Sequence, residues 1–130
     1  RRAAGVSGNL LPLEFRAIGT MAVSDEYLDF LRDLLDWVPG LRTKRMFGGI
    51  GLYSDSGFFA LVDQDGLYLK GDDLNRSLFS EGGAERFGYE KKGKRLSMDY
   101  WSVPADVLEE PDELAVWVHA AMEAASRANS

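Results

Sequence analysis

The chain has 130 residues, enough for one domain with a single core, and its 45% hydrophobic and 28% charged residues are typical of a globular protein. Its formal net charge of −6 argues against holding nucleic acid by bulk positive charge and against attraction to an anionic membrane. The absence of cysteine excludes disulfides, thiolate nucleophiles and cysteine-ligated zinc, and it fits the cytoplasmic location that we expect.

Residues 1–20 differ from the rest of the chain. Three arginines stand against Glu14, a net charge of +2, and polar residues and a proline interrupt the apolar positions, so no signal-peptide core is present. No apolar run approaches the ~18 residues that a membrane span needs. We expect residues 1–20 to be an N-terminal extension, from an upstream start or from cloning, and residues 21–130 to be the domain, without a membrane partner.

A helix is predicted to begin at Ser24, whose hydroxyl can cap it, with Asp25 and Glu26 placing negative charge in its first turn. Its apolar residues recur with a period of 3.6 and end before Pro39-Gly40. The predicted buried stripe consists of Tyr27, Leu28, Leu31, Leu34, Leu35 and Val38.

The next thirty or so residues have the composition of strands separated by short turns, which predicts antiparallel pairing. The predicted strands are Arg42–Phe47, Ile50–Tyr53, Phe58–Val62 and Leu67–Lys70. Residues 58–62 are apolar at every position, so we expect this strand to be central and covered on both faces, by helices or by another subunit. A strand of this kind favours a homodimer.

In the second half, Asp72 or Asp73 is predicted to cap a short helix that Gly82-Gly83 closes. A hairpin then turns at Lys92-Gly93, and its alternating apolar residues predict one core-facing side: Phe87, Tyr89, Leu96, Met98 and Tyr100.

A short helical turn at Ala105–Glu109 and a last helix starting at Pro111 complete the pattern, and the last helix carries a second apolar stripe: Leu114, Trp117, Val118, Ala121, Met122 and Ala125. The predicted fold class is α+β. We expect an antiparallel sheet of five to six strands packed on one face by amphipathic N- and C-terminal helices, in the order α, β-meander, α, β-hairpin, α.

Three glycines in a strand-like run, Gly48, Gly49 and Gly51, need a physical reason. Either the chain bends there, which is the explanation that we favour, or something packs against bare backbone. A phosphate-binding loop is disfavoured because a strand follows rather than a helix. One alternative is a ligand-binding or enzymatic site in which Arg45 holds an anion against the Gly48-Gly49 backbone, with Tyr89 or Tyr100 nearby.

Basic residues crowd the tip of the second hairpin, and Tyr89 and Trp101 lie near its base. The basic residues are Lys91, Lys92, Lys94 and Arg95. Cations interleaved with aromatic rings can bind single-stranded nucleic acid. The alternative, which we favour, is a solvated tip whose lysines protect a sheet edge from aggregation.

No catalytic, metal-binding or cofactor-binding residue is predicted. His119, the only histidine, lies outside the apolar stripe of the last helix and has no triad or zinc partners at a recognisable spacing. The run from Asp63 to Gly66 resembles the start of a calcium loop, but Leu74 occupies the position of the essential glutamate, so a hairpin turn explains it better.

Three motifs now carry a resemblance. They are Arg45-Met46-Phe47-Gly48-Gly49-x-Gly51-Leu52-Tyr53, Asp65-Gly66-Leu67-Tyr68-Leu69-Lys70, and Tyr89-x3-Gly93-x4-Met98-x-Tyr100-Trp101-x-Val103-Pro104. The chain closely resembles the TfoX/Sxy N-terminal domain family, the amino-terminal half of bacterial competence regulators, from about Ser24 to Ala125. The resemblance implies a bacterial cytoplasmic protein with a curved antiparallel sheet, self-association, and a role in switching on DNA-uptake genes rather than an enzymatic one.

The family supplies no catalytic residues to transfer, and Ser130 ends the chain where the second domain of the two-domain regulators would begin, so we expect a stand-alone module. We therefore predict a non-enzymatic regulatory or adaptor domain that forms a homodimer and binds a protein partner, such as the transcription machinery or a regulator. The candidate ligand- or partner-binding residues are Arg45, Phe47, Gly48, Gly49, Tyr89, Lys91, Tyr100 and Trp101.

Overall fold

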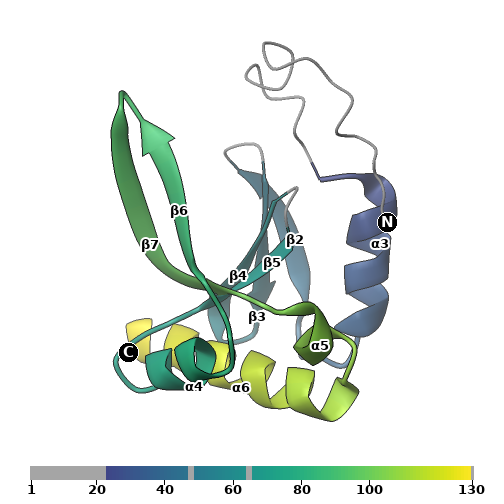
Figure 1. Ribbon diagram of the computed structural model, residues 1–130. Coiled ribbons are helices and arrows are strands. Elements are labelled where there is room, and N and C mark those ends of the chain that lie inside the picture. Colours follow the sequence, from purple (N-terminus) through teal and green to yellow (C-terminus); the bar gives the residue numbers. More distant parts are fainter. Residues whose placement is uncertain (1–22, 47–48, 64–65, 130) are drawn as a thin grey trace.

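The computed structural model describes residues 23–46, 49–63 and 66–129, so the predicted extension at residues 1–20, Phe47 and Gly48 lie outside it. Within the described ranges, six antiparallel strands form one sheet, and the helices lie against one of its faces (Figure 1). The predicted α+β class is confirmed.

Helix α3 spans Asp25–Leu34 and starts as the sequence predicts, because the Ser24 hydroxyl accepts a hydrogen bond of 3.1 Å from the backbone N–H of Tyr27. It ends earlier than predicted. Leu35 and Val38 lie in the turns that follow, where the N–H of Val38 donates to the carbonyl of Leu35, and both side chains are still buried. Pro39 restricts the backbone of Val38, directly before it, so it acts on the turns after the helix and not on its last residue, Leu34.

The strands of the sheet are β2 (Arg42–Met46), β3 (Gly49–Ser54), β4 (Gly57–Asp63), β5 (Gly66–Lys70), β6 (Arg86–Lys91) and β7 (Lys94–Ser102). They are arranged in the order β2-β3-β4-β5-β7-β6. Strands β2 to β5 form a meander, and β5 then pairs with β7 rather than with β6. The hairpin is therefore joined to the meander through β7, and β2 and β6 form the two edges.

Between β5 and β6 lies α4 (Arg76–Glu81), and after β7 come α5 (Ala105–Leu108) and α6 (Pro111–Ala128). Asp72 caps the turn before α4 rather than the helix itself, whose N-cap residue is Asn75, since the Asp72 carboxylate accepts hydrogen bonds from the N–H groups of Leu74 and Asn75. Pro111 is the first residue of α6, as predicted, and every residue of the predicted stripe is buried.

The core lies between the sheet and its helices. Helix α6 packs on β4 and β5, and the largest fully buried side chains include Trp117, Phe59 and Phe79. The rings of Phe79 and Trp117 lie 5.1 Å apart and join α4 to α6. Of the helices that the structure describes, none combines the length and apolar character needed to cross a bilayer.

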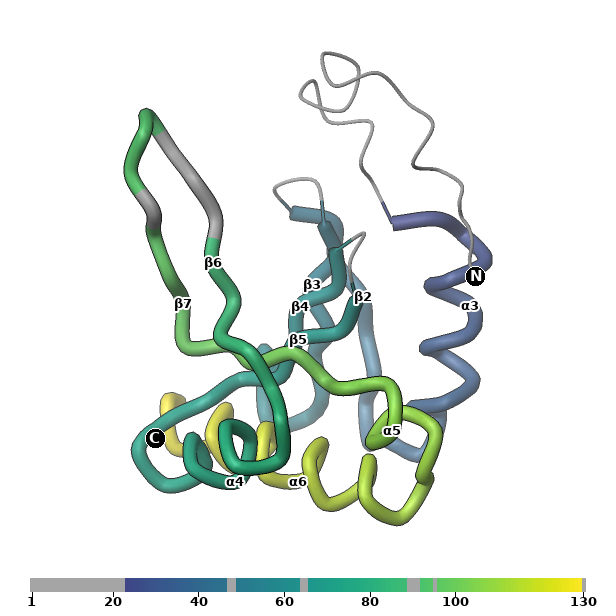
Figure 2. The backbone as a smooth tube through the Cα atoms, in the orientation of Figure 1, coloured from purple at the N-terminus to yellow at the C-terminus, as the bar shows by residue number. Residues whose placement is uncertain are grey.

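The predicted core-facing side of the hairpin is wrong for its outer part. Beyond its root, the β6–β7 hairpin extends past the helices (Figure 2). Leu96 and Met98 consequently remain 37% and 36% exposed. A period-2 pattern identifies which side chains share a face, but it does not say whether anything covers that face.

Candidate functional site: the open face of the sheet

The candidate site is the face of the sheet opposite the helices, which we call the open face. Cross-strand pairs share a face, and Leu61 pairs with both Gly51 and Tyr68, whereas Ala60 and Leu69 pair on the helix side. The same register places Lys70 beside Tyr100. The open face is formed by Arg42, Lys44, Tyr53, Phe58, Leu61, Tyr68, Lys70, Phe87, Met98 and Tyr100.

A β-bulge brings Phe58 to this face. The register shifts between Leu52, which pairs with Ala60, and Tyr53, which pairs with Phe58, so Phe59 is the extra residue of β4. Phe59 is fully buried, while Phe58 is half-buried and stacks on Tyr53. The predicted two-sided strand is therefore apolar on both faces, but among the described elements a helix covers only one of them.

Aromatic contacts on the open face form two groups, one that joins β3, β4 and β7 and one that joins β5 and β6. The ring centroid of Phe58 lies 5.0 Å from that of Tyr53 and 5.6 Å from that of Tyr100. At the root of the hairpin, Tyr68 and Phe87 meet edge to face at 4.8 Å. These centroid separations are the ones that aromatic pairs prefer. The rings of the open face therefore pack against one another within each group.

Two cations lie over these rings. The guanidinium carbon of Arg42 is 5.8 Å from the ring centroid of Tyr53, and Nζ of Lys70 is 5.3 Å from that of Tyr100. At the β2 edge, Arg42, Thr43, Lys44 and Tyr53 line a hollow of about 310 Å³. The open face therefore combines apolar and aromatic area with positive charge.

Close approach explains the two glycines of the run that the structure describes, Gly49 and Gly51. A Cβ on Gly49 would lie 2.6 Å from the carbonyl oxygen of Val62, and one on Gly51 would lie 2.7 Å from Cε of Met46 and 3.0 Å from Phe58. Packing against bare backbone therefore accounts for Gly49, whereas the favoured bend includes Gly48, which lies outside the described residues. Gly51 leaves room on the open face for the Met46 and Phe58 side chains.

Tyr100 lies at the floor of the open face and is only 5% exposed. Burial, together with the nearby Tyr53 and the charge of Asp99, raises the pKa of Tyr100 to about 12. Its phenol is consequently uncharged at neutral pH and is not poised to act as a base.

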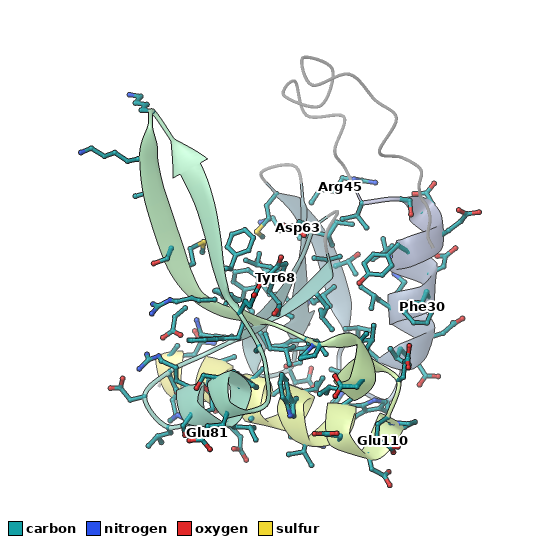
Figure 3. The ribbon with its side chains drawn as sticks, viewed as in Figure 1. Phe30, Arg45, Asp63, Tyr68, Glu81 and Glu110 are labelled. Carbon is teal, nitrogen blue, oxygen red and sulfur yellow. The ribbon has the colours of Figure 1, made fainter. Side chains whose placement is uncertain are left out.

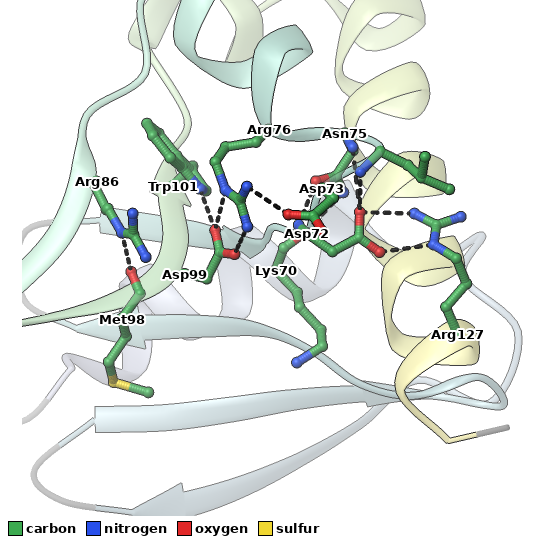
Figure 4. A network of polar contacts seen from close by, with 11 residues as sticks. Lys70, Asp72, Asp73, Asn75, Arg76, Arg86, Met98, Asp99, Trp101 and Arg127 are labelled. Carbon is green, nitrogen blue, oxygen red and sulfur yellow. Dashed lines mark hydrogen bonds and ion pairs between the residues drawn. The ribbon is translucent and has the colours of Figure 1, made fainter.

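On the helix side, a polar network holds α4 against β7 (Figure 4). Asp99 accepts hydrogen bonds from the Arg76 guanidinium and, at 2.8 Å, from Nε1 of Trp101. Burial alone would raise the pKa of Asp99, but the hydrogen bonds from Arg76 and Trp101 and the charges of Arg76 and Arg86 hold it below its ordinary value. Trp101, a predicted binding residue, is thus a buried anchor.

This network was not predicted from the sequence. Along β7, polar Ser97 and Asp99 alternate with apolar neighbours, and this pattern suggests a solvated face rather than a site of helix attachment. A second ion pair joins α6 to the turn before α4, where Nε of Arg127 lies 2.7 Å from the carboxylate of Asp72. Both pairs stabilise the fold at positions remote from the open face.

Among the predicted site residues that the structure describes, Arg45 and Tyr100 are not brought together. Arg45, labelled in Figure 3, is exposed and pairs with Ile50, which is buried on the helix side. Arg45 and Tyr100 therefore lie on opposite faces of the sheet. Lys92 and Lys94 are exposed at the hairpin tip, and the side chains of Tyr89, Lys91 and Arg95 lie outside the described part of the chain. Among the predicted residues whose side chains the structure describes, Tyr100 lies on the open face.

The described ranges contain no group of three or more acidic, histidine or cysteine side chains placed to hold a metal ion. His119 is exposed on α6, as predicted, and its ring centroid lies 5.0 Å from that of Trp37.

A larger hollow of about 420 Å³ lies near the end of α6. The polar groups there bond one another, since the Asn129 amide donates to the carbonyl of Ser56, whose N–H donates to the hydroxyl of Ser54.

Residues 33–125 match the sequence profile described as the TfoX N-terminal domain. The chain is also 31% identical over 112 residues to the DNA transformation protein TfoX1 of Aliivibrio fischeri, in an alignment that covers 85% of this chain and 51% of that protein. The chain therefore spans about half the length of the curated relative it matches.

Proposed function

Since the chain belongs to the TfoX N-terminal domain family, we propose that it is a non-enzymatic regulatory domain for DNA uptake that acts by binding another protein. The relative's name, DNA transformation protein, supports the process. The family resemblance suggests the kind of partner, which is the transcription machinery or a transcription regulator. Fold and family alone do not define a mode of action, so the proposal depends on a surface.

That surface is the open face. Its half-buried rings and the exposed Met98 form an apolar area that no described helix covers. Exposed apolar patches with polar rims are typical of protein interaction sites, and the charged rim here is supplied by Arg42 and Lys44. This single observation carries the proposal.

A matched pair of variants tests it in a bacterium that encodes the chain. Met98→Lys adds a charge to the open face at a side chain that is 36% exposed, and Val116→Lys adds the same charge to α6 at one that is 57% exposed. We expect Met98→Lys to lower transformation frequency by about tenfold or more, because the new ammonium lies in the apolar part of the face and must lose its water when the partner docks. Val116→Lys should match the wild type. Equal transformation frequencies, with both proteins folded and equally abundant, would refute the proposal.

The homodimer expected from the sequence stays a prediction. The open face is poorly suited to form the interface of such a dimer. Two copies meeting face to face would bring together two surfaces that each carry the positive charges of Arg42, Lys44 and Lys70, which opposes association. We therefore expect any dimer to use another surface. Light scattering of Met98→Lys checks this: the variant should keep the oligomeric state of the wild type.

A further inference from the structure

We propose that the open face binds an acidic, apolar segment of the partner protein, whose carboxylates enter the hollow between Arg42 and Lys44 while its apolar side chains cover Phe58, Leu61 and Met98. This inference rests on the proposed function and specifies the chemistry of the partner. It follows from the distribution of charge over the two faces of the sheet.

The protein is acidic overall, yet its charges are segregated. Helix α3 carries four acidic residues against one arginine, and the first turn of α6 adds Asp112 and Glu113. On the open face, Arg42, Lys44 and Lys70 supply positive charge, and of the described strand residues that face it only Asp63 is acidic. A cationic face on an anionic protein selects an anionic ligand.

The hollow at the β2 edge fits a carboxylate. Arg42 and Lys44 are both exposed and lie two residues apart on the same side of β2, and Tyr53, which is paired with Arg42, also lines the hollow. A guanidinium and an ammonium at this spacing can share one acidic side chain or bind two in succession. Phe58 and Leu61 continue the site inward, so an apolar residue must accompany the acid.

Other anions and other segments fit less well. Phe58 contacts the rings of both Tyr53 and Tyr100. Arg42 also lies over Tyr53, and Lys70 lies over Tyr100, which leaves little flat ring surface for stacked nucleic-acid bases. The net charge of −6 repels a long polyanion. Residues 1–20 carry a net charge of +2 and are therefore mismatched to a cationic face.

The test is a selection of short random peptides displayed on phage against the immobilised full chain. Individual selected peptides are then synthesised with a fluorescent label, and their dissociation constants are measured by anisotropy. Lys44→Glu and Arg45→Glu form the matched pair, since they are adjacent exposed residues of β2 that face opposite sides of the sheet and undergo the same charge change. Arg42→Glu is a second open-face variant in case Lys44→Glu does not fold.

We expect enrichment of aspartate and glutamate next to aromatic or aliphatic residues. Lys44→Glu and Arg42→Glu should each weaken the peptides by about tenfold, Arg45→Glu should leave affinity unchanged, and added salt should reduce it. Neutral or basic peptides, equal weakening by Arg45→Glu, or no selected peptide would each overturn the inference. A labelled oligothymidine that binds with the same dependence on Lys44 would overturn it in favour of nucleic acid.

The two proposals fail separately. If Met98→Lys abolishes transformation but the selection yields no acidic peptide, the open face is functional and the inferred partner chemistry is wrong. If acidic peptides bind with the expected dependence on Lys44 while Met98→Lys transforms normally, the face binds acidic segments but the proposed function is wrong.

Discussion

The ammonium of Lys70 lies 5.3 Å from the centroid of the Tyr100 ring, on the side of the sheet opposite the carboxylate of Asp99. Tyr100 and Asp99 are adjacent in sequence but belong to different environments. Tyr100 forms the floor of an aromatic surface, and Asp99 anchors a helix. We therefore expect Tyr100 to make stability depend on pH in the alkaline range and Asp99 to do so in the acidic range.

At high pH, Tyr100 should limit stability. Its pKa of about 12 in the folded protein lies above the ordinary value of 10.0, so the unfolded chain loses this proton first and the free energy of unfolding falls as pH rises between the two values. We expect Tyr100→Phe to remove this part of the pH dependence. The difference between the wild-type and Tyr100→Phe absorbance titrations at 295 nm should have a midpoint near 12, and a midpoint at the ordinary value would contradict the assignment.

At low pH, Asp99 should dominate. Its pKa is held below the ordinary value of 3.8, so its stabilising effect is complete above that value and is lost as pH falls through the folded-state pKa. Asp99→Asn should cost about 1 kcal/mol at neutral pH, a figure kept low because the Arg76 side chain is 37% exposed.

The difference in free energy of unfolding between Asp99→Asn and the wild type, measured with urea, should disappear as pH falls below 3.8 and through the folded-state pKa of Asp99. Asp73→Asn is the control, because Asp73 also contacts Arg76, at 2.9 Å, but is 94% exposed. It should change stability by less than about 0.5 kcal/mol. An Asp99→Asn difference that does not vary with pH would mean that the carboxylate charge is not what matters.

Asn75 should be among the residues most important for stability. It is 5% exposed, and its amide donates 3.0 Å hydrogen bonds to the carbonyls of Lys70 and Ala120 while its oxygen accepts from the N–H of Asp72 at 2.7 Å. Asn75→Ala should lower the free energy of unfolding by about 2–3 kcal/mol, because it removes the partners of buried backbone groups. Leu74→Ala, at a side chain 73% exposed, should have almost no effect; similar losses for both variants would show that the buried bonds contribute little.

Gly49 and Gly51 should differ in their tolerance of a methyl group. In Gly49→Ala the new Cβ meets a backbone carbonyl of the neighbouring strand at 2.6 Å, and that carbonyl cannot move without disturbing the sheet. A loss of about 1–3 kcal/mol is expected. In Gly51→Ala the nearest atom is the end of the flexible Met46 side chain. Thermal melts should therefore rank Gly51→Ala above Gly49→Ala, and the reverse order would contradict the close-approach explanation.

The elements of this fold could be predicted because each is encoded locally. The Ser24 cap, Pro111 at the start of α6, and the two apolar stripes are properties of short segments, and the structure contains them. The early end of α3 was not predicted, because its apolar period continues through Leu35 and Val38 while the backbone leaves the helix. Periodicity reports burial, and burial does not require helix.

The candidate site was less predictable, because it depends on register between distant strands. Arg42, Lys44 and Lys70 share a face only through the pairing of β2 to β5, and the bulge that turns Phe58 outward is not visible in the sequence. Arg45 attracted attention by its place before the glycines, yet the period of two places it on the opposite side from Lys44. The cation that matters for the proposed site is the adjacent residue.

Strand β7 serves two requirements along one stretch of chain. Leu96 and Met98 lie on its exposed side, while Asp99 and Trp101 hold the packing of α4 and the core. If the open face binds the partner as proposed, substitutions at the exposed positions would change what the domain binds without altering how it folds. Binding specificity and stability would then be set by alternate residues of a single strand, so that each could change while the other is kept.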